Sequence, residues 1–227
     1  MIMIKKFGLV LVAGSLTFIN LSAYASSGIF GSGVELNANG ALTNTLYALD
    51  NTGTTRLTPT GSTATLDQTS WANGSEPVPV LNLGAFNPGA GQSLTLTGGS
   101  LLTFKNSGSD VTAAFLDFRI FTPVGTPSGS FTEISLPFNQ DNVGGNTGDQ
   151  RWATEASSVN LLTGLVNGSY ELGVFLRETS SDGGAFSSNG GANYGATFQV
   201  VPEPSTWLAG AMTLGGCFYL RRRRRKA

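Results

Sequence analysis

The sequence predicts an all-β body, a two-sheet antiparallel sandwich of jelly-roll-like type, for three reasons. Short stretches alternate apolar and polar residues with a period of two, as half-buried strands do. Gly, Ser, Thr and Asn are abundant between these stretches, where turns need them. Only residues 157–165 have a helical pattern, and Asn160 and Gly164 favour a loop or short turn there. Eight or more short strands without a convincing helix are typical of a sandwich.

Two hairpins are expected in the first half of the body. Residues 34–38 alternate up to Asn39-Gly40, a pair that tolerates the positive φ angles of a type I′ turn, so residues 41–49 should return as the partner strand. Residues 94–105 repeat this pattern, with Gly98-Gly99 as a permissive turn in the middle. Both segments are therefore predicted to be antiparallel pairs.

Further strands are expected in the second half, because alternate residues are apolar in segments 114–121, 131–138, 170–177 and 196–200. Pro137 indicates that its strand lies at a sheet edge, since proline cannot donate to a ladder. Residues 61–74 and 180–195 are expected to be long loops. Loops carried by a rigid sandwich are common places for binding sites.

The composition excludes several classes of chemistry. The chain contains no histidine, which rules out Ser-His-Asp and Cys-His catalysis and the usual histidine-based zinc sites. Its single cysteine, Cys217, lies in the C-terminal apolar run. The body therefore has no disulfide, and packing must hold it together.

The whole-chain net charge of −1 conceals an acidic body. Eight of the thirteen Lys and Arg residues lie near the termini, so residues 26–201 carry five cations against thirteen acids, about −8. An acidic surface does not attract nucleic acid or anionic lipid, and no nucleic-acid partner is expected. Such a surface suits an extracellular protein or one that binds divalent cations.

Residues 1–25 have the pattern of a secretory signal peptide. Lys5 and Lys6 precede an apolar stretch at 7–19, and Ala23 and Ala25 are the small residues that a signal peptidase reads. We therefore expect cleavage after Ala25. An uncleaved N-terminal helix is the alternative, and the glycines and asparagine of the segment disfavour it.

The C-terminal segment 201–227 combines a Pro-Glu-Pro hinge, an apolar run at 207–220 and a basic end. The prolines exclude the hinge from a helix interior, so a membrane helix is expected to begin after Pro204. The run is shorter than the about 20 residues that span a bilayer comfortably, and snorkelling arginines can cover the deficit. Because Lys and Arg prefer the cytoplasmic side, the body at residues 26–200 is expected outside.

This order of features resembles the PEP-CTERM sorting signal of bacterial envelope proteins, over residues 201–227 only. The resemblance implies recognition by an exosortase, a membrane-embedded cysteine protease or transpeptidase, and transient anchoring in the inner membrane through the C-terminal helix. It also implies release to the cell surface or extracellular matrix, in the context of exopolysaccharide and biofilm. An ordinary tail anchor or a buried core helix is the alternative. The residues that the resemblance assigns to sorting and processing are Val201, Pro202, Glu203, Pro204, Ser205, Arg221, Arg222, Arg223, Arg224 and Arg225.

A second resemblance lies inside the body. Residues 101–108, 129–138 and 189–194 look like parts of a β-sandwich module found in exported bacterial proteins. The resemblance covers about residues 85–200. It implies an accessory or structural module and transfers no catalytic residue.

Residues 139–151 are the densest polar segment and the candidate calcium site. Calcium prefers carboxylate, amide and carbonyl oxygens on a flexible loop, but the spacing is not that of an EF-hand. An Asx-rich turn between two strands is the alternative. The candidate ligands are Asp141, Asn142, Asn146 and Asp149.

Aromatic residues in or beside the expected loops make carbohydrate binding the alternative function, because exposed aromatic rings stack on sugar rings. They are Trp71, Trp152, Tyr194 and Phe186. Packing of the tryptophans into the sandwich core is the competing interpretation.

A hydrolase working with two carboxylates is the third hypothesis, with acids available at Glu133, Asp141, Asp149, Glu155, Glu171 and Glu178. Alternation directs Glu133 and Glu171 outward, where acids are usually solvated. The sequence therefore favours a non-enzymatic surface or matrix protein.

Overall fold

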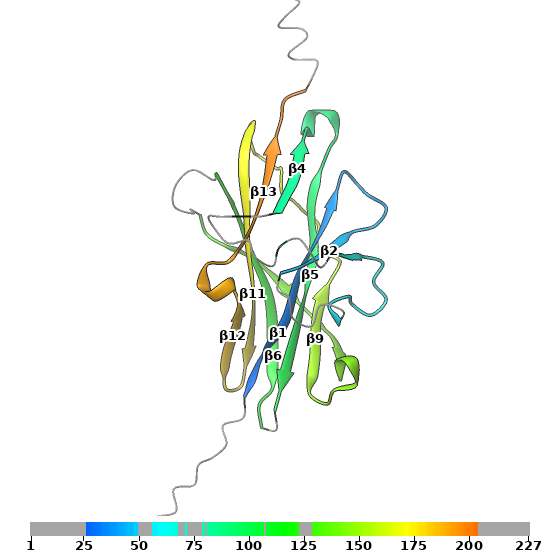
Figure 1. The fold of residues 1–227 in the computed structure, drawn as a ribbon, viewed down its shortest axis with the longest axis vertical. Coiled ribbons are helices and arrows are strands. Elements are labelled where there is room, and N and C mark those ends of the chain that lie inside the picture. The colour runs from blue at the N-terminus through cyan, green and yellow to red at the C-terminus, as the bar shows by residue number, and fades with distance from the viewer. Residues whose placement is uncertain are drawn as a thin grey trace, which may run out of the picture.

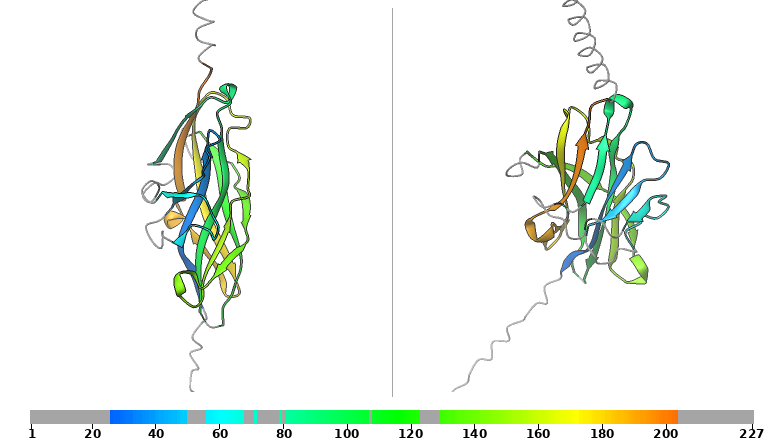
Figure 2. Two further views of the ribbon diagram at one scale, coloured as in Figure 1. Left: turned by 90° about the vertical axis from the view of Figure 1, so that its right-hand side faces the viewer. Right: turned by 45° about the horizontal axis from the view of Figure 1, so that its top comes forward.

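The computed structural model describes residues 26–49, 56–67, 71, 79, 81–106, 108–122 and 129–203. They form an all-β body in which two sheets pack face to face (Figures 1 and 2). Short 3-10 turns at Pro88–Ala90, Val143–Gly145 and Asn189–Gly191 lie between strands. In this part of the chain no helix has the length and apolar character needed to cross a bilayer. The expected signal helix and C-terminal membrane helix lie outside the described residues.

The first sheet has seven strands. In spatial order they are β3 (Thr65–Asp67), β2 (Thr45–Ala48), β1 (Ser27–Ala38), β5 (Leu94–Lys105), β9 (Asp149–Thr154) and β8 (Phe138–Asp141), with β10 (Val159–Asn160) also beside β5. The two long strands β1 and β5 pair over nearly their whole length and form the centre of this sheet.

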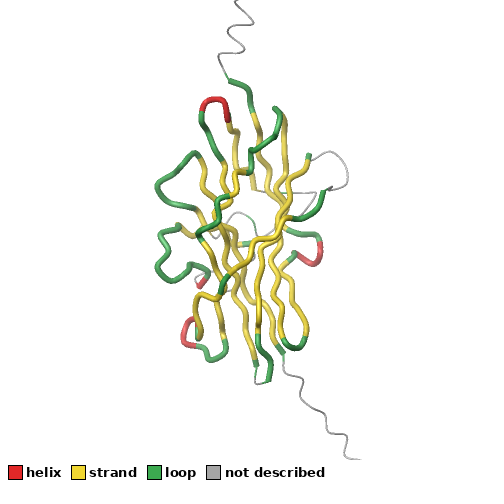
Figure 3. The backbone as a smooth tube through the Cα atoms, turned by 180° about the vertical axis from the view of Figure 1, so that it is seen from behind, coloured by secondary structure: helices red, strands yellow, loops and turns green. Residues whose placement is uncertain are grey.

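The second sheet has six strands. Their order is β4 (Leu81–Phe86), β13 (Tyr194–Val200), β11 (Gly168–Ser180), β6 (Val111–Phe121) and β7 (Thr132–Leu136), with β12 (Gly183–Ser187) also beside β11. Seen from behind, strands account for most of the traced body (Figure 3). The long strand β11 is the centre of this sheet, because it pairs with β6, β12 and β13.

Both sheets are mixed, so the expectation of a purely antiparallel sandwich is wrong. β2 pairs with β3 in parallel, and β4 pairs with β13 in parallel. Parallel neighbours need a long connection. β4 and β13 are more than a hundred positions apart in the sequence, and alternation within a strand carries no information about the direction of so distant a partner.

The predicted hairpin at residues 94–105 is also wrong, because this segment is the single continuous strand β5. Gly98 and Gly99 allow the neighbouring strands to approach β5 closely. A Cβ atom on Gly98 would lie 1.8 Å from the backbone oxygen of Thr154, and one on Gly99 would lie 2.9 Å from the backbone oxygen of Gly33. The pairing with β1 shifts register between Glu35 and Leu36, so that β5 contains a bulge beside Gly98.

The other predicted strands are confirmed, except that one predicted strand is split into two. Asn39 and Gly40 have the positive φ angles of the expected turn, and β2 returns antiparallel to β1. Segments 114–121, 170–177 and 196–200 fall within β6, β11 and β13. Segment 131–138 instead contributes β7 to one sheet and the start of β8 to the other, and Pro137 lies where the chain changes sheets. Phe138 is 51% exposed.

Apolar side chains from both sheets fill the space between them. The residues of this core include Val34, Leu36, Leu96 and Leu101 of the first sheet and Leu116, Leu172, Val174, Leu176 and Phe198 of the second. A smaller cluster of Leu46, Ala48, Leu57, Leu102 and Val143 covers the opposite face of the first sheet. The first sheet is therefore buried on both faces along much of β1 and β5.

Candidate functional site

The start of the predicted sorting segment rests against the body. The backbone N–H of Val201 donates a 2.9 Å hydrogen bond to the carbonyl of Phe86, which extends the pairing of β13 with β4. Glu203 packs on Gly89, where an added Cβ would lie 2.3 Å from its Oε1 atom. Val201, Glu203 and Gly89 border a surface depression of about 370 Å³ that Pro202 and Leu165 also line. Val201, Pro202 and Glu203 thus lie against the end of the sandwich, directly after the end of β13 (Figure 1).

The other residues assigned to sorting and cleavage lie outside the described part of the chain. They are Ala23, Ala25, Pro204, Ser205, Arg221, Arg222, Arg223, Arg224 and Arg225.

The four candidate calcium ligands lie in one loop, but several of their oxygen atoms already accept hydrogen bonds. Asn142 Oδ1 accepts from the backbone N–H of Gly148 at 3.3 Å. Asp149 Oδ2 accepts from Asn146 Nδ2 at 2.9 Å and pairs with Arg56 at 3.3 Å. Asp141 is exposed at the end of β8 and lines an open depression of about 620 Å³. No group of three or more metal-binding Asp, Glu, Cys or His side chains is found in the described residues. The hydrogen bonds within the loop agree with an Asx-rich turn, and the calcium site stays a prediction.

A buried cation lies at the base of this loop. The guanidinium of Arg151 donates hydrogen bonds to four neutral oxygen atoms: Asn139 Oδ1 at 3.0 Å, the Arg56 carbonyl at 2.7 Å, Thr60 Oγ1 at 2.8 Å, and Gln140 Oε1. Arg151 is only 5% exposed, and burial lowers the pKa of its guanidinium. Two polar side chains of residues 139–151, Asn139 and Gln140, therefore serve as hydrogen-bond acceptors for the buried Arg151.

Three of the four candidate sugar-stacking aromatics are buried. Trp71 is fully buried, and its indole N–H donates a 2.6 Å hydrogen bond to the carbonyl of Gly195. Trp152 is 8% exposed and packs edge-on against Phe138. Tyr194 is 5% exposed and lies within the core. These three side chains do not have the exposed faces that stacking on a sugar requires. They pack in the protein interior instead.

Two of the carboxylates considered for hydrolysis are also buried. Glu171 is fully buried and Glu178 is 2% exposed, so the solvated position expected for Glu171 is wrong. Glu171 does point to the outer face of β11, but its neighbour Phe121 on β6 is buried as well, so this part of the outer face is covered. Glu133 is exposed as expected, and it pairs with Arg177.

The outer face of the second sheet carries a cluster that we call the aromatic–arginine strip. Its members are Phe115, Asp117, Arg119, Phe131, Glu133, Phe175, Arg177 and Phe186. Cross-strand pairing aligns them: Asp117 lies opposite both Glu133 and Phe175, and Arg177 lies opposite both Phe115 and Phe186. Residues that face each other across a ladder point to the same side of the sheet. The strip therefore crosses β7, β6, β11 and β12.

Arg177 is the electrostatic centre of the strip. Its Nε atom lies 3.0 Å from Asp117 Oδ2, its Nη2 atom pairs with Glu133, and its guanidinium lies 4.2 Å from the ring centroid of Phe115. Burial raises the pKa of Asp117, and the charge of Arg177 opposes that rise. The three charged groups form a network that holds a planar guanidinium against an aromatic face.

The other aromatic rings extend this surface. Phe131 packs edge-on against Phe175 with centroids 4.8 Å apart, and the guanidinium of Arg119 lies 4.4 Å from the Phe131 centroid. Phe175 lies 6.3 Å from Phe186, which is 62% exposed. The strip offers ring faces next to charged hydrogen-bonding groups, which is a suitable surface for a ligand with apolar faces and hydroxyl groups.

The sequence alone points to Phe186 but not to the strip as a whole. Alternation already places Phe115, Asp117 and Arg119 on one side of residues 114–121, and Phe175 and Arg177 on one side of 170–177. Outward aromatic residues on two strands were the available signal. Residues 180–195 were expected to be a loop, whereas β12 pairs with β11 and places Phe186 beside Arg177.

No protein-family model matches the chain, and no curated protein matches it. The function is therefore inferred from the residues and from their geometry.

Proposed function

We propose that the chain is an exported, non-enzymatic protein of the bacterial cell surface or extracellular matrix, processed through an exosortase-type system. The observation that carries this proposal is the order of features after residue 200: Pro-Glu-Pro, an apolar run and five consecutive arginines. A signal peptide at residues 1–25 supports it, because a C-terminal sorting signal requires an exported chain.

The body is compatible with such a role. Its strands end at Val200, directly before the hinge, and Val201 to Glu203 border the end of the sandwich. β1 begins and β13 ends at opposite ends of the long axis of the body (Figure 1). The sheet changes between β3 and β4, β4 and β5, and β5 and β6 support the jelly-roll-like variant of the sandwich.

The proposed partners follow from the two terminal segments. Signal peptidase cleaves after Ala25, and the exosortase-type protease or transpeptidase acts near the hinge. Before processing, the C-terminal helix holds the protein in the inner membrane with its arginines on the cytoplasmic side. Afterwards the acidic body reaches the surface or matrix, where exopolysaccharide and biofilm provide its context.

The test is the fate of the tail. Deletion of residues 221–226, or loss of the exosortase, should leave a membrane-held precursor that keeps the Pro-Glu-Pro segment. Mass spectrometry of the fractionated native protein measures this directly. A mature protein that still contains the C-terminal run in the unaltered strain would refute the sorting proposal.

Carbohydrate binding is the second candidate function, and the aromatic–arginine strip favours it. Phe186 is exposed and adjoins Phe175, and Arg177 with its two carboxylates supplies polar groups at the same surface. We propose this strip, rather than Trp71, Trp152 and Tyr194, as the place where a polysaccharide would contact the body.

A further inference from the structure

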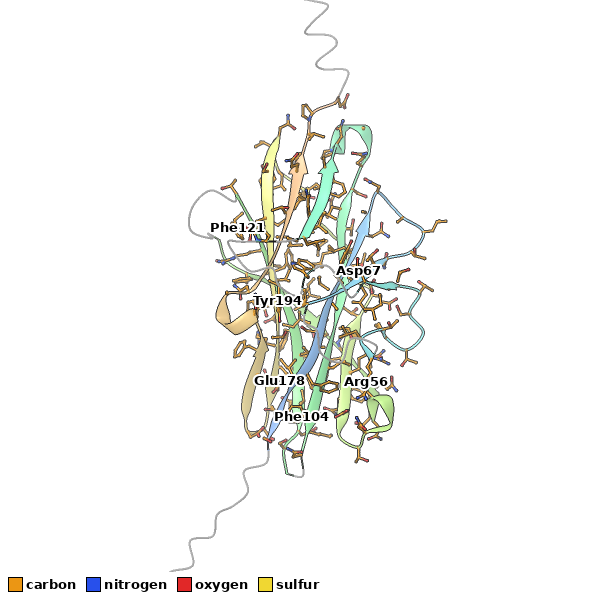
Figure 4. The ribbon with its side chains drawn as sticks, in the orientation of Figure 1. Arg56, Asp67, Phe104, Phe121, Glu178 and Tyr194 are labelled. Carbon is orange, nitrogen blue, oxygen red and sulfur yellow. The ribbon has the colours of Figure 1, made fainter. Side chains whose placement is uncertain are left out.

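The chain enters the sandwich beside two carboxylates. The hydroxyl group of Ser27 lies 3.2 Å from Glu178 Oε1 and 3.2 Å from Asp182 Oδ1, and the backbone N–H of Ser27 also donates to Asp182. Glu178 lies near the end of β11 and Asp182 lies in the turn between β11 and β12. Figure 4 shows Glu178 toward the end of the sandwich where β1 begins.

Ser26, the first described residue, is held firmly at this end. Its carbonyl accepts a 3.0 Å hydrogen bond from the backbone N–H of Asn106, and its hydroxyl accepts a 2.9 Å bond from Asn106 Nδ2. The next residue, Ser27, pairs with Lys105 of β5. The backbone nitrogen of Ser26 is therefore placed one residue from the N–H group that already donates to Asp182.

These carboxylates have no cationic partner in the described part of the chain. Glu178 is 2% exposed, and its Oε2 atom has no hydrogen-bond partner there. Among the described residues, neither Glu178 nor Asp182 forms an ion pair with Lys or Arg, and Lys105 at the same end pairs with Asp110 at 2.9 Å. A buried carboxylate without a cation is costly, and burial accordingly raises the pKa of Glu178.

We propose that Glu178 and Asp182 form a binding site for the α-ammonium group of Ser26 in the processed protein. This inference rests on the proposed export, with cleavage after Ala25. Hydrolysis of the bond between Ala25 and Ser26 consumes one water molecule, leaves a carboxylate on Ala25 and leaves an ammonium group on Ser26.

Cleavage changes the chemistry of this nitrogen atom. In the precursor it is a neutral amide with one N–H donor, and after cleavage it is a cation with three donors. The new charge appears one residue before Ser27, whose hydroxyl group contacts the buried Glu178 and the exposed Asp182, at the start of β1 in the first sheet. Removal of the signal peptide therefore stabilises the body to which it was attached.

The experiment compares two chains in mild detergent, one of residues 26–227 and one of residues 23–227. The longer chain carries the same sequence but moves the ammonium group three residues away. NMR titration of the isotope-labelled α-amine should give, for the chain that begins at Ser26, a pKa about one unit above the ordinary value of about 7.7–8.0. The longer chain should titrate normally, and its unfolding equilibrium constant should be about tenfold larger, because one pKa unit corresponds to a factor of ten.

Two variants assign the effect to the carboxylates. Asp182→Asn at an exposed position and Glu178→Gln at the buried one should each shrink the difference between the two chains. If Glu178→Gln prevents folding, the titration of the unaltered chain and of Asp182→Asn still decides the matter. An ordinary α-amine pKa in the chain that begins at Ser26, together with equal stability of the two chains, would overturn the proposal.

Export is tested separately by the N-terminal residue of the exported protein. A start at Ser26 supports the cleavage on which the site depends. A start at another residue refutes that cleavage, and with it the role of the site in the natural protein, whatever the titration shows for the engineered chain.

Discussion

The guanidinium of Arg151 donates a 2.7 Å hydrogen bond to the backbone carbonyl of Arg56, which lies 95 positions earlier in the chain. The same side chain is bound to Asn139, Thr60 and Gln140. It thereby joins the segment that covers the first sheet to the strands β8 and β9. A buried arginine with four neutral acceptors is a structural element of the loop that resembled a calcium site.

Arg151→Met should lower the free energy of unfolding by about 3 kcal/mol, because it removes the four hydrogen bonds of a buried, charged donor and leaves partly buried acceptors without it. Chemical denaturation followed by tryptophan fluorescence measures the change. Arg56→Gln is the control, since the ion pair of Arg56 with Asp149 is partly exposed and should contribute less than about 1 kcal/mol. Equal losses in the two variants would contradict the structural role of Arg151.

Gly98→Ala should destabilise the body by about 3 kcal/mol or more, because the added Cβ would lie 1.8 Å from the Thr154 carbonyl and would separate β5 from β9. The matched control is Gly168→Ala, where the nearest atom is 3.8 Å away on the Tyr170 ring. Thermal unfolding of the two variants measures the contrast. If Gly98→Ala were as stable as the control, the continuous strand β5 would be in doubt and the hairpin expected from the sequence would regain support.

The stability of the body should fall as the pH rises above the ordinary glutamate value near 4.5, in part because of Glu35. Glu35 is fully buried, and burial raises its pKa, although hydrogen bonds from Asn44 at 2.5 Å and Thr97 at 2.9 Å oppose the shift. A raised pKa means that the folded protein binds the proton more tightly than the unfolded chain does. The stabilisation is therefore complete at low pH and is lost as the pH rises through the folded-state value.

Glu35→Gln should remove this part of the pH dependence and raise stability at neutral pH relative to the unaltered protein. Denaturation midpoints between pH 4 and pH 8 provide the measurement. A Glu35→Gln profile parallel to that of the unaltered protein would show that the buried carboxyl group does not titrate in this range.

Phe186→Ala should reduce binding to the exopolysaccharide of the producing cell about tenfold if the aromatic–arginine strip binds sugars, because the most exposed ring of the strip is lost. Affinity electrophoresis in gels that contain the polysaccharide measures the retardation. Phe138→Ala is the control, since Phe138 is 51% exposed but lies on β8 of the first sheet, away from the strip. Equal retardation of both variants and the unaltered protein would refute the strip as a sugar site.

Several features of this protein follow from neighbouring residues alone. The alternation in residues 114–121 and 170–177 specifies strands because side-chain direction reverses at every residue of an extended backbone. Asn39-Gly40 specifies a turn because both residues accept positive φ angles, which they have in the structure. Composition by itself makes the body acidic and free of histidine, and the expectations for the two terminal segments also depend only on local order along the chain.

Other features depend on partners that are distant in the sequence. From its neighbours in the sequence, Gly98 is predicted to lie in a turn, but in the structure it packs against the Thr154 carbonyl. Glu171 is predicted to be solvated, but the outer face around it and Phe121 is buried. The parallel pairing of β4 with β13 and the aromatic–arginine strip likewise require strands from different parts of the chain to meet. Periodicity determines which way a side chain points from its own strand. Only the tertiary structure decides what lies opposite, and that decides whether a glycine is a turn, whether a carboxylate is buried and which aromatic rings share a surface.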